Sequence, residues 1–222
     1  YEMTSSLVGS EMCKETASII GKERIVWRYD PILINEHYTR EYHKKYFQKL
    51  CDSLCNYTEK CTVSFVDLYK NTERNTKSLN IHTPSNEEVL ELMSFFSKIA
   101  HENGIYIDTC TEEYDLSSLN IKHACCIDKS RLERIGNYQL KIGKDKNQRS
   151  ICGCIESIDI GMYNTCENGC MYCYANFNCE MARKNHNKHN PLSPLISGEI
   201  EYDDKLNIRN VKSNINNQLQ FF

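Results

Sequence analysis

The stretch SNEEVLELMSFFSKIAHENGIYIDT, residues 85–109, predicts a helix that leads directly into a strand. Ser85 and Glu88 have the spacing of a capping box at a helix start. The dipeptide Asn103-Gly104 is typical of a helix end, and residues 105–109 then predict a strand. Between these signals apolar residues recur on one helical face, at Val89, Leu92, Met93, Phe96, Ile99 and Ala100.

The same order of elements occurs upstream. Residues 24–28, closed by Pro31, and residues 61–66 predict two further strands. The helix between them is indicated by spacings typical of one helical face, at His43, Phe47, Leu50, Cys51 and Leu54. Strands about forty residues apart, alternating with helices, indicate βα units around a parallel sheet.

We therefore expect an α/β fold, a partial TIM-like parallel barrel of βα units with a C-terminal cysteine-rich iron–sulfur segment. A whole barrel of this type takes ~250 residues, and the chain starts with Tyr1, so we expect a fragment whose N-terminal part is missing. The βα units are assigned to residues 1–140, the cysteine-rich segment to 141–182 and a polar tail to 183–222. We expect His37, His43, His82 and His101 at the surface and not as ligands.

The composition excludes several classes of protein. The chain has 222 residues, 40% hydrophobic and 26% charged, which suits a folded domain. A net charge of −3 argues against binding nucleic acid through overall charge. No apolar run approaches the ~18–20 residues of a membrane span, and no signal peptide is recognisable, so we expect a cytoplasmic protein without a membrane partner. Thirteen cysteines in such a chain indicate metal binding or catalysis before disulfides.

The most informative motif is C-x3-C-x2-C, formed by Cys166, Cys170 and Cys173. Three thiolates this close can hold three irons of a 4Fe-4S cluster and leave the fourth iron open. Gly169 allows the loop backbone to approach the inorganic core. The alternative is a structural zinc knuckle that takes Cys152 or Cys154 as an extra ligand.

This motif resembles the cluster loop of radical S-adenosylmethionine enzymes, in which an aromatic residue also precedes the third cysteine, as Tyr172 does here. The resemblance implies that the open iron binds S-adenosylmethionine, whose reductive cleavage gives a 5′-deoxyadenosyl radical that abstracts hydrogen from a substrate. It also implies a reductant protein such as a flavodoxin or ferredoxin. Gly169 and Tyr172 are the candidate cofactor-binding residues.

A wider resemblance covers nearly the whole chain. It resembles the uncharacterised bacterial family DUF1848, whose C-terminal cysteine cluster is similar to that of radical S-adenosylmethionine enzymes. An Arg-Arg-Thr-Asp element found near the N-terminus of family members is absent, which agrees with the expected fragment. The stretches that carry the resemblance, besides the cysteine segment, are residues 27–31, 64–69, 109–112, 124–128 and 144–149.

A second cluster is a further hypothesis. The strand ends of a barrel converge on one face, so cysteines that follow strands can meet there. The family pattern implies the set Cys110, Cys126, Cys152 and Cys154 as ligands, with Cys125 packed in the core. The alternative is that these cysteines are small buried hydrophobic residues.

Charged residues at the predicted strand ends are candidates for catalysis and substrate binding. Arg28 could clamp a carboxylate or phosphate through its fork of N–H groups. Asp30 or Glu112 could orient a ribose or an amine, and Asp67 falls at an equivalent position. The alternative for Arg28 and Asp30 is a structural ion pair.

The leading hypothesis is an enzyme of the radical S-adenosylmethionine type. The first alternative is a non-catalytic 4Fe-4S protein that transfers electrons or stabilises the fold. The second is a zinc-stabilised module associated with DNA. Its basis is the basic stretch from Lys129 to Arg149, together with residues 218–222, QLQFF, which resemble the peptide that docks on the DNA sliding clamp.

Overall fold

The computed structural model describes residues 4–68, 70–110 and 112–216, which form two compact units. Of the described residues, the sheet unit comprises those within 4–66, 81–157 and 214–216, and the loop unit comprises those within 67–80 and 158–213. The expected iron–sulfur segment, 141–182, is divided between them. Within the described residues, no helix is long and apolar enough to cross a membrane.

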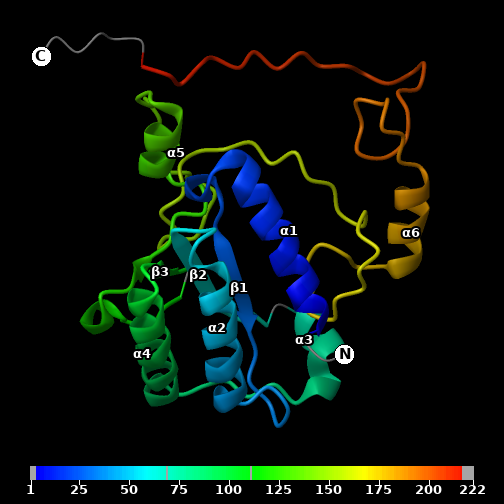
Figure 1. The fold of residues 1–222 in the computed structure, drawn as a ribbon. Coiled ribbons are helices and arrows are strands. Elements are labelled where there is room, and N and C mark those ends of the chain that lie inside the picture. The colour runs from blue at the N-terminus through cyan, green and yellow to red at the C-terminus, as the bar shows by residue number, and fades with distance from the viewer. Residues whose placement is uncertain (1–3, 69, 111, 217–222) are drawn as a thin grey trace, which may run out of the picture. The chain divides into compact units, whose positions relative to one another are not determined.

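The sheet unit is a mixed α/β structure built on four parallel strands in the order β1-β2-β3-β4 (Figure 1). The strands pair in register, so that Arg28 of β1 lies opposite Thr62 of β2, and Thr62 opposite Asp108 of β3. Consecutive parallel neighbours confirm the predicted alternation of strands and helices. The strand bounds are β1 Trp27–Ile32, β2 Lys60–Phe65, β3 Tyr106–Thr109 and β4 Lys122–His123.

Strand β1 extends past the position where the sequence predicts its end. It continues through Pro31 to Ile32, and its register with β2 shifts between Tyr29 and Ile32. A proline lacks the N–H of a regular ladder, but such an irregularity at the edge of a sheet accommodates it. The prediction that Pro31 closes the strand was therefore wrong.

Helices α2 (Arg40–Leu54) and α4 (Asn86–Glu102) lie side by side along the strands (Figure 1). The predicted capping box is confirmed, because Ser85 Oγ accepts the N–H of Glu88 and the Glu88 carboxylate accepts the N–H of Ser85. The rings of Phe47 and Phe96 stack with their centroids 3.8 Å apart, and both side chains are fully buried. This aromatic pair is the centre of the core.

His43 belongs to that core. It is buried on α2, accepts a hydrogen bond at Nδ1 from the Tyr29 hydroxyl and donates from Nε2 to the carbonyl of Leu33. Burial lowers the pKa of its imidazole. The expectation of a surface residue was wrong, because His43 occupies the same helical face as Phe47.

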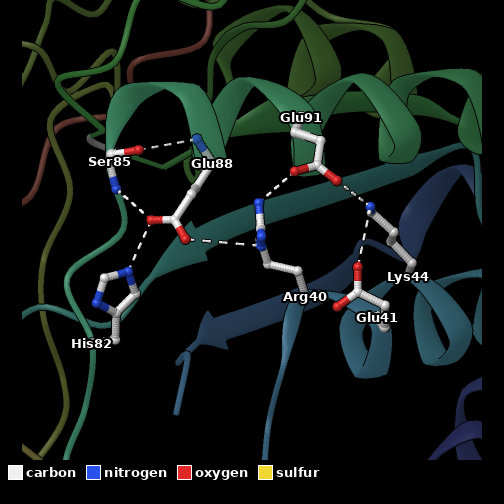
Figure 2. Close-up of polar contacts among 7 residues, drawn as sticks. All are labelled: Arg40, Glu41, Lys44, His82, Ser85, Glu88 and Glu91. Carbon is white, nitrogen blue, oxygen red and sulfur yellow. Dashed lines mark hydrogen bonds and ion pairs between the residues drawn. The ribbon is translucent and has the colours of Figure 1, made fainter. Parts of the chain in front are cut away.

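Ion pairs join the first turns of α2 and α4 at the surface (Figure 2). Arg40 and Lys44 of α2 both bind the carboxylate of Glu91 on α4. Glu88, besides its capping role, receives a hydrogen bond from His82 at 2.8 Å. These contacts bridge the two helices at the surface.

The other helices are divided between the two units. Within the sheet unit, α1 (Thr4–Ile20) ends directly before Gly21, and α5 (Lys129–Gly136) follows β4. The loop unit contains α3 (Lys70–Thr76) and α6 (Cys179–Asn187). The sequence did not indicate α5 or α6, because α5 buries no side chain and α6 buries only Ala182. The short 3₁₀ turns are η1 (Lys22–Arg24), η2 (Lys77–Leu79) and η3 (Ser117–Leu119).

Candidate functional site

One face of the sheet carries a row of polar side chains. Lys60 Nζ lies 2.6 Å from Asp108 Oδ2, and both side chains are more than nine-tenths buried. The Thr62 hydroxyl donates to the other oxygen of Asp108 at 2.7 Å. A buried carboxylate is stable only when paired and hydrogen-bonded in this way. The pair therefore anchors the polar face between β2 and β3.

On the same face, in the neighbouring strand, Arg28 is the second residue of β1 and is fixed by Asp30, two positions later. Arg28 Nε and Nη2 donate to Asp30 Oδ2 at 3.0 and 2.6 Å. The hydroxyl of Ser64 donates to Asp30 Oδ1 at 2.6 Å, so the carboxylate is bound from two strands. The predicted residues Arg28 and Asp30 are thus brought together as an ion pair.

Two predicted thiols meet beside this pair. Cys110 directly follows β3, and its N–H donates to the carbonyl of Val63 at 2.9 Å. Cys126 follows β4, and its sulfur lies 3.4 Å from the Cys110 sulfur. Arg28 Nη1 donates to the Cys126 sulfur at 3.2 Å. Three segments of the chain therefore place two sulfurs and a guanidinium in contact.

These contacts shift the pKa values of the two thiols in opposite directions. The hydrogen bond from Cys110, followed by that from Arg28, lowers the pKa of Cys126 to about 6. The hydrogen bond to Cys126 and burial raise the pKa of Cys110. These contacts therefore favour the thiolate form of Cys126 over that of Cys110.

The other two members of the predicted second cluster, Cys152 and Cys154, are buried nearby in the same unit. The Cys154 sulfur accepts the N–H of Ile127 at 3.3 Å. Burial and the hydrogen bond with the Cys152 thiol raise the pKa of Cys154. The four thiols thus lie as two pairs, joined through the backbone at residues 126–127.

Gly153, between these two cysteines, packs closely against Cys125. A Cβ at this position would lie 2.5 Å from the sulfur of Cys125, closer than real contacts allow. Cys125 itself, predicted in the core, is half-buried. The close packing of Gly153 against Cys125 fixes the backbone that carries Cys152 and Cys154.

The C-x3-C-x2-C motif lies in the loop unit. Cys166 and Cys170 are exposed and Cys173 is half-buried. The N–H of Cys173 donates to the carbonyl of Cys170 at 3.1 Å, which forms a turn between the last two cysteines. Gly169 has φ +66° with open space around its Cα, and Tyr172 is partly exposed. A bulky group can therefore approach this loop from solvent.

The sequence did not point to Asn164, which closes this loop at its base. Asn164 has φ +55°, and its side-chain oxygen accepts the N–H groups of Phe177 and Asn178 at 2.7 and 3.2 Å. Its own N–H donates to the carbonyl of Ala175, and its carbonyl accepts from the side chain of Asn185 on α6. Asparagine tolerates this left-handed conformation better than other residues with a side chain.

The donor set of the motif fits an iron–sulfur cluster, since thiolates are the usual ligands of such clusters. Across residues 4–68, 70–110 and 112–216, however, no three or more cysteine, histidine or carboxylate side chains form a group placed to hold a metal ion. The chemistry of the donors thus supports a cluster. To bind it, the three thiols of the loop would have to turn toward one another.

The remaining predicted residues do not join Arg28 and Cys126 in the contacts described. Glu112 accepts the N–H of Phe65, the last residue of β2, at 2.7 Å. Asp67 is exposed and belongs to the loop unit. The proposed clamp-binding peptide, residues 218–222, lies outside the described residues.

Lys60 and Thr62 were missed as members of the polar face, although the sequence carries a signal for them. They alternate with Cys61 and Val63, which is the pattern of a strand with two different faces. Asn164 has no comparable signal, because its role depends on a backbone conformation.

A family model described as "Domain of unknown function (DUF1848)" matches residues 7–175. The matched range contains both groups of cysteines. No curated protein and no solved structure matches the chain.

Proposed function

The chain belongs to the DUF1848 family, and on this premise we propose that it is an iron–sulfur enzyme of the radical S-adenosylmethionine type. Cys166, Cys170 and Cys173 are the proposed cluster ligands. The observation that carries the proposal is a loop closed at Asn164 that presents three thiols at ligand spacing, two of them exposed. When bound, a cluster with an open iron supplies the electron for reductive cleavage of S-adenosylmethionine.

In this proposal, the residues around the motif position the cluster and shield the cofactor from solvent. The open space beside Gly169 leaves room for the inorganic core, and Tyr172 lies next to the third ligand, where it can cover one side of the cofactor. Glu167, between the first two ligands, pairs with His186 of α6 at 3.5 Å. This pair ties the loop to α6.

We also propose that the sheet is part of a TIM-like barrel. Its support is the order β1-β2-β3-β4 with every pair parallel, together with the contact between the successive helices α2 and α4. Successive right-handed crossovers in one direction place their helices on the same face, as barrels do. Asp30 then lies nearer than Arg28 to the carboxyl end of β1, the end at which barrel enzymes bind substrate.

Catalytic or substrate-binding roles stay predictions for Arg28, Asp30, Asp67 and Glu112. Both edges of the Arg28 guanidinium are engaged, by Asp30 and by Cys126. A substrate carboxylate would therefore have to displace one of them.

The test is metal analysis and low-temperature EPR of the anaerobically reconstituted chain, reduced with dithionite, with and without S-adenosylmethionine. We expect about four irons per chain and a reduced signal that changes when the cofactor is added. Replacing Cys166, Cys170 or Cys173 with alanine should remove the signal. Cys179→Ala, which removes an exposed thiol of the same unit, should preserve it.

The other outcomes decide against the proposal. A cluster signal indifferent to S-adenosylmethionine, without 5′-deoxyadenosine among the products, would favour an electron-transfer or structural cluster. Tightly bound zinc with no signal would favour the zinc-stabilised module. A reductant protein and a cytoplasmic location are parts of the same proposal.

A second cluster on Cys110, Cys126, Cys152 and Cys154 would raise the content to about eight irons. Changing Cys152 and Cys154 to alanine would then lower it to about four. Unchanged iron in this variant would exclude the second cluster.

A further inference from the structure

A cavity of about 510 Å³ lies between the sheet and helix α5, within the sheet unit. Lys60, Tyr106 and Lys122, the first residues of β2, β3 and β4, are among the residues that line it. The cavity is therefore at the amino-terminal ends of these strands, away from the carboxyl ends at which barrel enzymes bind substrate. Its volume is typical of a site for a small organic molecule.

One wall of the cavity is formed by charged groups that the fold has buried. Lys60 and Asp108 line it as an ion pair, and the hydroxyl of Thr62 donates to the same carboxylate. Cavities left by imperfect packing of a core are lined by apolar side chains. The buried ion pair therefore distinguishes this cavity from a packing defect.

The cavity has a surplus of positive charge. Among the described residues, four lysine and arginine side chains and three carboxylates line it. Lys60 is paired with Asp108, and Arg134 Nη2 binds the carboxylate of Glu59 at 2.7 Å. The third carboxylate, Asp128, caps α5 by accepting a backbone N–H. Two cationic side chains are thus left without a carboxylate.

These two cations are Arg131 and Lys122. Arg131 Nη2 donates to the backbone carbonyls of Glu23 and Ile25 at 2.6 and 2.8 Å, so its partners are neutral. Lys122 is exposed at the start of β4, and its ammonium group has no ion pair within residues 4–68, 70–110 and 112–216. An anion in the cavity would meet two positive charges that the described residues do not neutralise.

The side chain of Tyr106 gives the cavity a flat wall. Tyr106 is 46% exposed although it belongs to a strand, and it lines the cavity together with the half-buried Cys125. A planar apolar group can stack on such a ring. A phosphate monoester is a poorer match than a carboxylate, because it carries almost two negative charges at neutral pH and would lie near three carboxylates.

We propose that this cavity binds a small aromatic monocarboxylate. Its carboxylate is bound by Lys122 and Arg131, and its ring packs on Tyr106. The site uses none of the proposed cluster ligands. Binding should therefore persist in a chain that lacks the three thiols of the C-x3-C-x2-C motif, so that failure of this inference and failure of the proposed function are distinguishable.

The probe is 4-fluorobenzoate, titrated into the full chain and followed by fluorine NMR and by amide chemical shifts. We expect a Kd of about 1 mM, with shift changes confined to residues 59–60, 106–108 and 122–134. The neutral analogue 4-fluorobenzamide should bind about tenfold more weakly, because it lacks the charge. Phenyl phosphate should also bind more weakly than 4-fluorobenzoate.

Lys122→Glu should weaken binding of 4-fluorobenzoate about tenfold. Lys146→Glu is the matched control and should not change it, because Lys146 is an exposed lysine of the same unit that does not line the cavity. Ser130→Trp adds a large ring at the cavity wall and leaves the charges unchanged, so it should abolish binding even if Lys122→Glu disturbs β4.

Several results would overturn the proposal. These are no binding at about 10 mM probe, shift changes outside the cavity, equal affinity for the benzamide, or equal effects of the two lysine variants. Tighter binding of phenyl phosphate would replace the carboxylate by a phosphate as the ligand class.

Discussion

The two groups of cysteines are held by different physical means. In the sheet unit, Cys110 and Cys126 follow strands, and their sulfurs contact each other and an arginine that is itself fixed by an ion pair. In the loop unit, Cys166 and Cys170 are exposed on a loop closed by hydrogen bonds to Asn164. The sulfurs of the first group are already in contact without a bound ligand. The thiols of the second group would come together only when a cluster binds.

The strongest test of this contrast removes the centre of the core. Phe96→Ala deletes a fully buried ring that stacks on Phe47, and it should lower the free energy of unfolding by about 3–5 kcal/mol. Denaturant titration measures the loss. Hydrogen exchange should show that protection falls in the sheet unit first.

Tyr174→Ala is the control for this prediction, because it removes a ring that is 66% exposed in the loop unit. Its effect should stay within about 0.5 kcal/mol. Equal losses in the two variants would show that the loop unit depends on side-chain packing as much as the sheet does.

A second test addresses the polar face. Lys60→Met leaves the buried carboxylate of Asp108 without its cation and should cost about 3 kcal/mol. The double change Lys60→Met with Asp108→Leu should recover most of that loss, since it removes the uncompensated charge. A single variant as stable as the parent would mean that water reaches Asp108.

Patterns of periodicity and capping predicted the strands and the helices that cover them. The face of α4 from Val89 to Ala100 was correctly predicted because burial and sequence spacing coincide there. His43 could have been placed in the core by the same pattern, but its residue type suggested the surface. For His43, the helical spacing predicted burial more reliably than the residue type.

The thiol site was only partly predictable. Strand ends indicated that Cys110 and Cys126 could meet, but the contact of Arg28 with Cys126 depends on register and on the rotamers of both side chains. Asn164 could not be predicted, because its left-handed backbone and its four hydrogen bonds join positions up to 21 residues apart. Such a role leaves no local pattern in the sequence.

A third test weakens the base of the cysteine loop. Asn164→Ala loses the bonds to Phe177 and Asn178 and puts alanine at φ +55°, where it is disfavoured. Local opening of the loop should become easier by about 1–2 kcal/mol, measured by hydrogen exchange at residues 164–178. Iron retention should fall in parallel, while global unfolding stays as in the parent.

Asn210→Ala is the control for the loop, because Asn210 is exposed in the same unit. It should change neither exchange nor iron retention. If Asn164→Ala lowered the stability of the sheet unit as well, the separation between the two units would be wrong.

The smallest expected effect concerns pH and belongs to the sheet unit. Burial lowers the pKa of His43 below its ordinary value of 6.5, so between these two values the unfolded chain binds the proton and the folded chain does not. Stability should therefore fall as the pH drops below about 6.5 and level off below the folded pKa. His43→Gln should flatten this part of the stability profile, whereas His101→Gln, at an exposed position on α4, should leave it unchanged. A profile equally steep in both variants would place the acid sensitivity at a residue other than His43.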